Sequence, residues 1–233
     1  MLSMASPPTD ARLRLRISAV SGKVRVTAEP RVDVVVDRGG VAAATADGAV
    51  EIRAARSSDS VDVRCPVGAD VMVGTRSGGI ELRGRFGAVG VTSQSGSIRV
   101  AAAEEADLRT VSGVVELDEC DGRCRVSTTS GRITVGATRD AEISTTSGSV
   151  GVDGVAGSVQ VRSVSGKVSV GSSAGGPVNA STVSGSITIR LPAGVRPTVR
   201  TSGPGSVRSS FEPGDDVLID IASVSGTVRL VPA

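Results

Sequence analysis

Apolar and polar residues alternate along most of this chain, and the alternation restarts at a Ser-Gly dipeptide about every 18 residues. With the serine counted as position zero, positions −6 and −4 are small or apolar, and positions +3 and +5 are apolar. Because alternate residues of a β-strand point to the same face, both segments are predicted to be strands with one buried face. At each dipeptide the inward-facing positions change from even-numbered to odd-numbered, counted from the serine. Every repeat is therefore predicted to be strand, corner, strand.

The glycine of each dipeptide is the predicted corner, since glycine tolerates the positive φ that lets both flanking strands keep an inward face. Successive spacings of 17 to 19 residues are typical of stacked supersecondary units and too short to include a helix. The fold class predicted is an all-β, single-chain β-helix or solenoid with about 18 residues per coil. The predicted vertex glycines are Gly78, Gly96, Gly113, Gly131, Gly148, Gly166, Gly185 and Gly226.

The two ends of the chain depart from the regular repeat. Residues 1–70 are predicted to form a modified, hairpin-containing β cap with irregular coils, because their Gly spacings are longer. Residues 71–233 are predicted to be regular solenoid with a distorted coil near 191–216, where Pro-Gly turns cluster. One continuous domain is expected. Segment 195–216 either folds over the C-terminal end as a lid, or leaves an open coil that pairs end-on with a second copy as a homo-oligomer.

Several sequence strings resemble a known family. They are Thr-Val-Ser-Gly-x-Val, Thr-Thr-Ser-Gly-x-Ile, and the Val-Arg-Cys-Pro-Val-Gly-Ala-Asp-Val segment before the first regular coil. The chain resembles a bacterial family of unknown function labelled putative adhesin. The resemblance implies a β-solenoid of the kind found in envelope-associated or stress-linked proteins, and it implies no catalytic residues.

Composition narrows the functional classes. The chain has no His, Trp or Tyr, so a Ser-His-Asp triad and any His-containing zinc site are excluded. The net charge is only +2 and two Phe are the only aromatic residues, so nucleic acid is not an expected partner. No stretch approaches the roughly 20 apolar residues of a membrane span, and no secretory signal is evident at the N-terminus. A cytoplasmic protein without a cofactor is expected.

Three cysteines and two acidic clusters are the remaining chemical candidates. Cys65, Cys120 and Cys124 are expected to be reduced and buried. Cys120 and Cys124 could ligate a metal or form a redox pair, but they align with Val155 and Val159 of a later coil, which favours core packing. The clusters could bind calcium or serve a carbohydrate-active β-helix enzyme, although a solvated edge is favoured because a sugar platform of aromatic residues is missing. The clustered carboxylates are Glu104, Glu105, Asp107, Asp118, Glu119 and Asp121.

The predicted function is a non-enzymatic β-solenoid scaffold or binding protein, adhesin-like or associated with the cell envelope or with stress. The alternative is the carbohydrate-active enzyme. In the later coils, the residues at two outward offsets are expected to form a flat, hydroxyl-rich face that could bind a glycan or protein partner. Its residues are Thr134, Ser169 and Thr188 at one offset and Ser149, Lys167 and Ser186 at the other. Outward charges should also alternate in sign between coils, as in Glu81, Arg99 and Glu116.

Overall fold

The computed structural model of the protein describes residues 12–45, 49–171 and 176–232. The chain forms two compact units, Met1–Leu117 (unit 1) and Asp118–Ala233 (unit 2). Every regular element in the described residues is a strand, and nearly all pairings are parallel, which confirms the all-β solenoid prediction. The expected division at residue 70 and the single continuous domain stay predictions.

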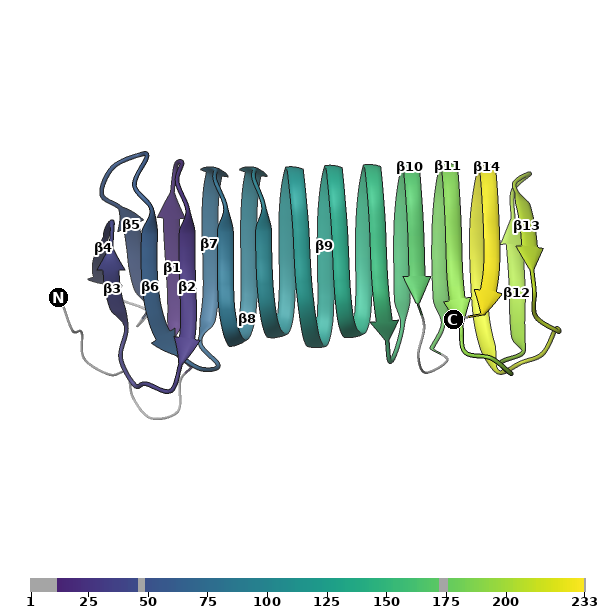
Figure 1. The fold of residues 1–233 in the computed structure, drawn as a ribbon, viewed down its shortest axis with the longest axis horizontal. Helices are drawn as coiled ribbons and strands as arrows, with labels where there is room; N and C mark the ends of the chain where they lie inside the picture. Colours follow the sequence, from purple (N-terminus) through teal and green to yellow (C-terminus); the bar gives the residue numbers. More distant parts are fainter. Residues whose placement is uncertain (1–11, 46–48, 172–175, 233) are drawn as a thin grey trace. The chain divides into compact units, whose positions relative to one another are not determined.

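Unit 1 is built from eight strands and the first part of a ninth (Figure 1). They are β1 (Arg14–Ala19), β2 (Val24–Glu29), β3 (Val35–Arg38), β4 (Gly40–Ala44), β5 (Val50–Ala54), β6 (Val61–Pro66), β7 (Asp70–Ser77), β8 (Ile80–Ser95) and β9 (Ile98–Val155). β1 pairs in parallel with both β5 and β7, and β2 pairs in parallel with both β6 and β8. The layers therefore do not follow chain order, because β5 and β6 stack on the far side of β1 and β2 from β7 and β8.

The N-terminal end of unit 1 contains the predicted hairpin. β4 pairs antiparallel with β5, the next strand in sequence, and β3 pairs antiparallel with β6. A parallel stack that ended on β5 and β6 would present a row of unpaired backbone groups. These two antiparallel strands cover that row.

Unit 2 holds the rest of β9 with β10 (Val159–Gly171), β11 (Val178–Leu191), β12 (Pro197–Ser202), β13 (Ser206–Ser209) and β14 (Val217–Pro232). The strands lie in the order β9, β10, β11, β14, β12, and β13 also pairs with β14. After β11 the chain therefore skips one layer to form β12 and β13, then returns as β14 into the gap (Figure 1).

This order settles how the C-terminal strand is covered. β12 and β13 pair along β14, which confirms the prediction that the distorted segment folds over the last regular coil. The covering layer is more polar than β14: Thr201 lies beside Ile221 and Ser209 beside Leu230, although Val199 and Val207 lie beside Ile219 and Val228. The edge open to a second copy thus belongs to β12 and β13. End-on pairing stays a prediction, which light scattering at micromolar concentration would test.

The coil interior follows the offsets predicted from the sequence, and the core contains Val126, Ile133, Val135, Ile143 and Val150 of unit 2. The hydroxyl at position −2 is also buried in unit 2, and in most coils it satisfies the bent backbone at the corner. The hydroxyls of Thr182 and Ser223 are buried without a hydrogen-bond partner. Thr145 donates its hydroxyl to the carbonyl of Ser147 over 3.2 Å, and the same bond recurs in neighbouring coils. These inward hydroxyls are therefore structural.

The vertex glycines all have positive φ, between 130° and 158°, as predicted. Gly148 shows why no other residue fits: a Cβ added to it would overlap the carbonyl oxygen of Gly131, the vertex of the preceding coil. The backbones of successive corners are therefore in direct contact. Both the positive φ and the contact exclude a side chain.

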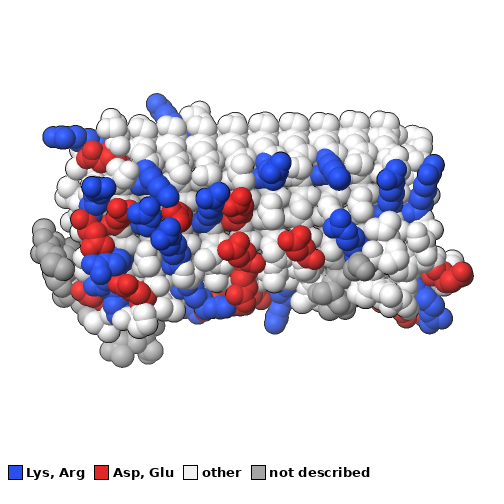
Figure 2. All heavy atoms as spheres, viewed as in Figure 1, with Lys and Arg blue, Asp and Glu red and all other residues white. Residues whose placement is uncertain are grey.

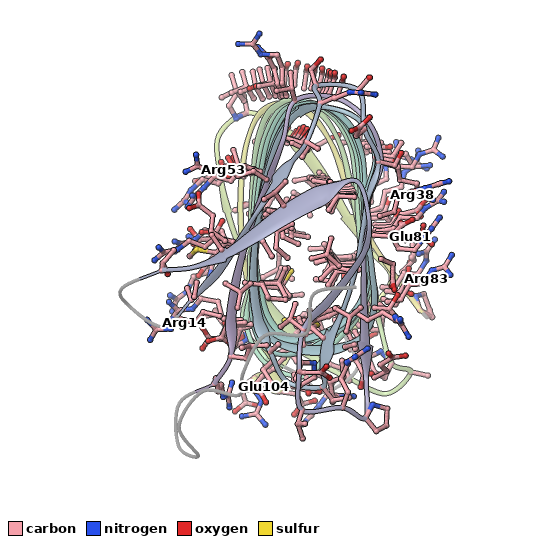
Figure 3. All side chains as sticks on the ribbon, turned by 90° about the vertical axis from the view of Figure 1, so that its left-hand side faces the viewer. Arg14, Arg38, Arg53, Glu81, Arg83 and Glu104 are labelled. Atoms are coloured by element: carbon pink, nitrogen blue, oxygen red, sulfur yellow. The ribbon has the colours of Figure 1, made fainter. Side chains whose placement is uncertain are left out.

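The predicted alternation of outward charges is confirmed in unit 1. Successive layers carry Arg38, Asp62, Arg25, Glu81, Arg99 and Glu116 at one outward position. Arg99 Nε lies 2.6 Å from Glu116 Oε2. Hydrogen bonds from Lys23 and Arg83 lower the pKa of Glu81 to about 2. Arg38, Glu81 and Arg83 point outward on the same side in Figure 3, and Figure 2 shows both signs of charge intermingled over these strands.

Replacing a vertex glycine should destabilise the fold far more than replacing an ordinary strand glycine. Gly148→Ala introduces a Cβ at φ 138° against the backbone of Gly131, so we expect a loss of about 2 to 4 kcal/mol in unfolding free energy. Gly154→Ala is the matched control, because the Cβ that it adds would have no atom within 4 Å. Denaturant titration of both variants checks this. Equal midpoints would contradict the backbone contact.

Candidate functional site

The predicted hydroxyl face exists as two adjacent rows on the outer side of unit 2. Lys167 lies between Ser149 and Ser186 in register, and Ser169 lies between Gly151 and Thr188. Thr134 occupies the same offset one coil earlier and is partly exposed. The structure thus brings the predicted residues together, and their role in binding stays a prediction.

The same two rows continue onto β14, which the sequence prediction did not include. Thr227 lies beside Ser186, and Arg229 lies beside Thr188. Counting two and four residues from the last vertex serine, Ser225, would have found both. Arg190 Nη1 also donates to Ser169 Oγ over 3.1 Å, so one hydroxyl of the face is already engaged.

A second surface, on the strand segments that precede the vertices, forms an open groove of about 350 Å³ in unit 2. It crosses β10, β11, β14 and β12. One row of side chains along it is polar and in register: Gln160, Asn179, Asp220 and Arg200. The parallel row forms the floor: Arg162, Ser181, Ala222 and Ser202. The middle of the floor, at Ser181 and Ala222, carries small side chains that leave room for a ligand.

An apolar ridge runs beside the floor row. Val164, Val183 and Val224 each precede a vertex serine, and they are 48%, 49% and 58% exposed. The register of the residues on either side of them places the three valines next to one another on β10, β11 and β14. Ser225 Oγ donates to the carbonyl of Val183 over 3.4 Å, which ties adjacent coils together at this ridge. The strand surface is therefore amphipathic. The valine row lies next to the vertex, the floor row lies in the middle, and the polar row with its amides lies farthest from the vertex.

Only part of this groove could be found from the sequence. Gln160, Arg162, Asn179 and Ser181 lie at the outward offsets −5 and −3 of regular coils. Arg200 and Ser202 belong to the distorted segment, and they reach the groove only because β12 pairs with β14. No repeat spacing signals that pairing.

Cys120 and Cys124 are buried on either side of the corner opposite the vertex, which confirms core positions for both. The Cys124 S–H donates to the Cys120 sulfur and lowers the pKa of Cys120 to about 7, against the opposing effect of burial, and the Gly122 backbone adds to the lowering. That hydrogen bond and burial raise the pKa of Cys124. Burial raises the pKa of Cys65, in unit 1, to about 12.

The acidic clusters are divided between the units, with Glu104, Glu105 and Asp107 in unit 1 and Asp118, Glu119 and Asp121 in unit 2. In unit 1, Glu104 pairs with Arg12 at 2.5 Å and Asp107 with Arg109 at 2.6 Å. Within the described ranges, no three His, Cys, Asp or Glu side chains gather closely enough to hold a metal ion.

No helix in the described ranges has the length and hydropathy needed to cross a bilayer.

The regular coils of unit 2 carry a recognisable family signature. Residues 123–212 match the family model Toastrack DUF4097. The match confirms, for this segment, the resemblance to a family of unknown function that the Ser-Gly strings indicate. The Toastrack segment includes the predicted hydroxyl-face residues and most of the groove, and it ends before β14 begins.

Two solved structures are similar to the chain at low identity. One is described as a putative adhesin from Bacteroides fragilis NCTC 9343, with 10% identity, a TM-score of 0.45, and coverage of 94% of this chain and 93% of the other. The second is described as a putative cell adhesion protein from Clostridium sporogenes ATCC 15579, with 8% identity, a TM-score of 0.27, and coverage of 98% and 96%. The comparison with curated proteins gave no match.

The three thiols should differ in reactivity toward a small alkylating reagent such as iodoacetamide. At pH 7.5 we expect Cys120 to react faster than Cys65 when local opening admits the reagent to these buried thiols. The thiolate is the nucleophile, and the hydrogen bond from Cys124 lowers the pKa of Cys120 whereas burial raises the pKa of Cys65. Trypsin places the three cysteines on separate peptides, because it cleaves before Cys65 at Arg64, between Cys120 and Cys124 at Arg123, and after Cys124 at Arg125. Mass spectrometry then follows each peptide.

The unfolded protein is the control, because its three thiols should react at similar rates. In Cys124→Ser a hydroxyl remains as a donor, whereas Cys124→Ala removes the donor and should slow Cys120 at pH 7.5. Equal rates for Cys65 and Cys120 in the folded protein would contradict the assigned hydrogen bond.

Proposed function

We propose that unit 2 is a non-enzymatic, adhesin-like scaffold that binds an extended polar polymer on its outer strand surfaces. The polymer lies along the direction in which the coils of unit 2 stack. Side chains at one offset repeat about every 4.8 Å in that direction, so successive repeats of a polymer can meet equivalent hydrogen-bonding groups. The adhesin label of the family that the sequence resembles agrees with this role.

The observation that supports binding most directly is the groove over β10, β11, β14 and β12. Its volume of about 350 Å³ lies in the range of ligand sites, and its polar row is in register across four strands. The four strands are hydrogen-bonded to one another, so the surface is preformed. A rigid, preformed surface loses little conformational entropy when a ligand binds.

The lining of the groove favours binding over hydrolysis. Glycoside hydrolysis uses a pair of carboxyl groups, one as acid and one as base or nucleophile. Among the residues that line the groove only Asp220 is acidic. The groove thus offers hydrogen bonds and charge to a ligand without the second carboxyl group of a hydrolase.

Both outer faces of unit 2 are tested together by retention on insoluble polymers, with peptidoglycan, cellulose and chitin as probes. Thr134→Glu with Thr188→Glu places charge on the hydroxyl face, and Ser181→Leu places an uncharged, bulkier side chain in the middle of the groove. We expect wild type to be retained on at least one polymer and one of the two variants to lower the retained fraction about fivefold or more.

Arg139→Gln is the control, since Arg139 is exposed at a corner outside both faces. Circular dichroism shows whether each variant keeps its strands. The proposal fails if no polymer retains the wild type, or if both face variants bind as well as Arg139→Gln does.

A further inference from the structure

The groove of unit 2 has a charge pattern as well as a shape. Arg162 lies at one end of the floor row on β10, and Arg200 lies at the opposite end of the polar row on β12. Along the direction in which the coils stack, three strand spacings separate them, about 14 Å. Asp220 is the single acidic side chain between them, so the lining has two positive charges and one negative charge, or +1.

Arg162 is only loosely engaged by its neighbour. Its Nη1 lies 3.9 Å from Glu142 Oε1, while the other oxygen of Glu142 accepts two hydrogen bonds from Arg125, at 2.8 and 3.1 Å. The ion pair of Glu142 is therefore made mainly with Arg125. The guanidinium of Arg162 keeps donors that can point toward a ligand, and a guanidinium binds carboxylates in a bidentate geometry.

The polar row suits a sugar better than a peptide. Gln160 and Asn179 each offer an amide donor and an acceptor, and Asp220 adds acceptors, which together match neighbouring sugar hydroxyls. Val164, Val183 and Val224 offer an apolar surface to the C–H face of a ring. A peptide would bind a sheet by adding a strand to an edge, but β10, β11 and β14, which carry most of the groove, are interior strands that are paired on both sides.

We propose that this groove is a binding site for an acidic glycan, a polysaccharide of uronic acid units whose carboxylates pair with Arg162 and Arg200. The proposal rests on the function proposed above and specifies its ligand class. Hydroxyls of the sugar rings bind the Gln160, Asn179 and Asp220 row, and the ring faces pack on the valine ridge. The charge-assisted bonds weaken as ionic strength rises.

The test compares two forms of one polymer, oligogalacturonate and its methyl ester of equal length, by calorimetry with the full chain. We expect the acid form to bind at least about tenfold more tightly than the ester at about 50 mM salt, with the ratio falling at about 500 mM. Arg162→Gln with Arg200→Gln should abolish the difference. Arg139→Gln should leave it unchanged, and the uncharged, bulkier Ser181→Leu should weaken binding of both forms alike.

The other outcomes separate the two proposals. Equal binding of acid and ester that Ser181→Leu weakens would overturn the acidic-glycan inference and leave the scaffold function standing. Equal or tighter binding of poly-glutamate, or an acid preference that survives loss of both arginines, would also overturn the inference. Failure of the acid form to bind at all would overturn it too, while retention on the insoluble polymers would still support the scaffold.

Discussion

The contact between the backbones of successive corners is the constraint on which each unit depends. The vertex glycine of one coil lies so close to the carbonyl of the vertex glycine before it that no Cβ fits between them. Where one coil follows the previous one directly, a spacing of 17 to 19 residues lets each corner meet the corner before it. A close, uniform separation in turn selects thin core layers of Val, Ile and Ala, whose branched or small side chains fill the narrow interior.

Because the register between coils is fixed, the outward side chains at one offset of successive coils lie in a straight row. In unit 1 the row is used for charge pairing, since Asp62, Arg25 and Glu81 neutralise one another in adjacent layers. In unit 2 the corresponding rows are hydroxyl-rich, with Lys167 and Arg229 as their charged members, and the rows before the vertices form the groove with its amides and two arginines. Surface ion pairs contribute little stability individually. Their alternation chiefly prevents the repulsion that like charges in neighbouring layers would cause.

The sequence predicted the features that repeat, and for the two ends it predicted a hairpin and a covering segment but not the order of the layers. The vertices, the inward offsets, the buried Cys120 and Cys124, and the grouping of Ser149 with Lys167 all follow from counting residues within a regular coil. The order of the layers at the ends does not follow from counting residues. A stack in chain order and the observed stack, with β14 between β11 and β12, would both bury apolar residues at similar offsets. β14 lies between β11 and β12, where its Ile219, Ile221 and Leu230 are buried, whereas the end layer mixes Val199 and Val207 with the polar Thr201 and Ser209. The groove depends on that choice through Arg200.

The layer order in unit 2 is therefore the claim to test first, and chemical cross-linking tests it directly. Ser202→Cys with Ala222→Cys places two exposed thiols on β12 and β14 in register, while Ser202→Cys with Ser181→Cys places them two layers apart. Dibromobimane becomes fluorescent only when it joins two thiols that lie close together. The structure predicts efficient cross-linking of the 202/222 pair and little of the 181/202 pair. The reverse result would place β12 directly on β11, in chain order, and would contradict both the capped end and the groove.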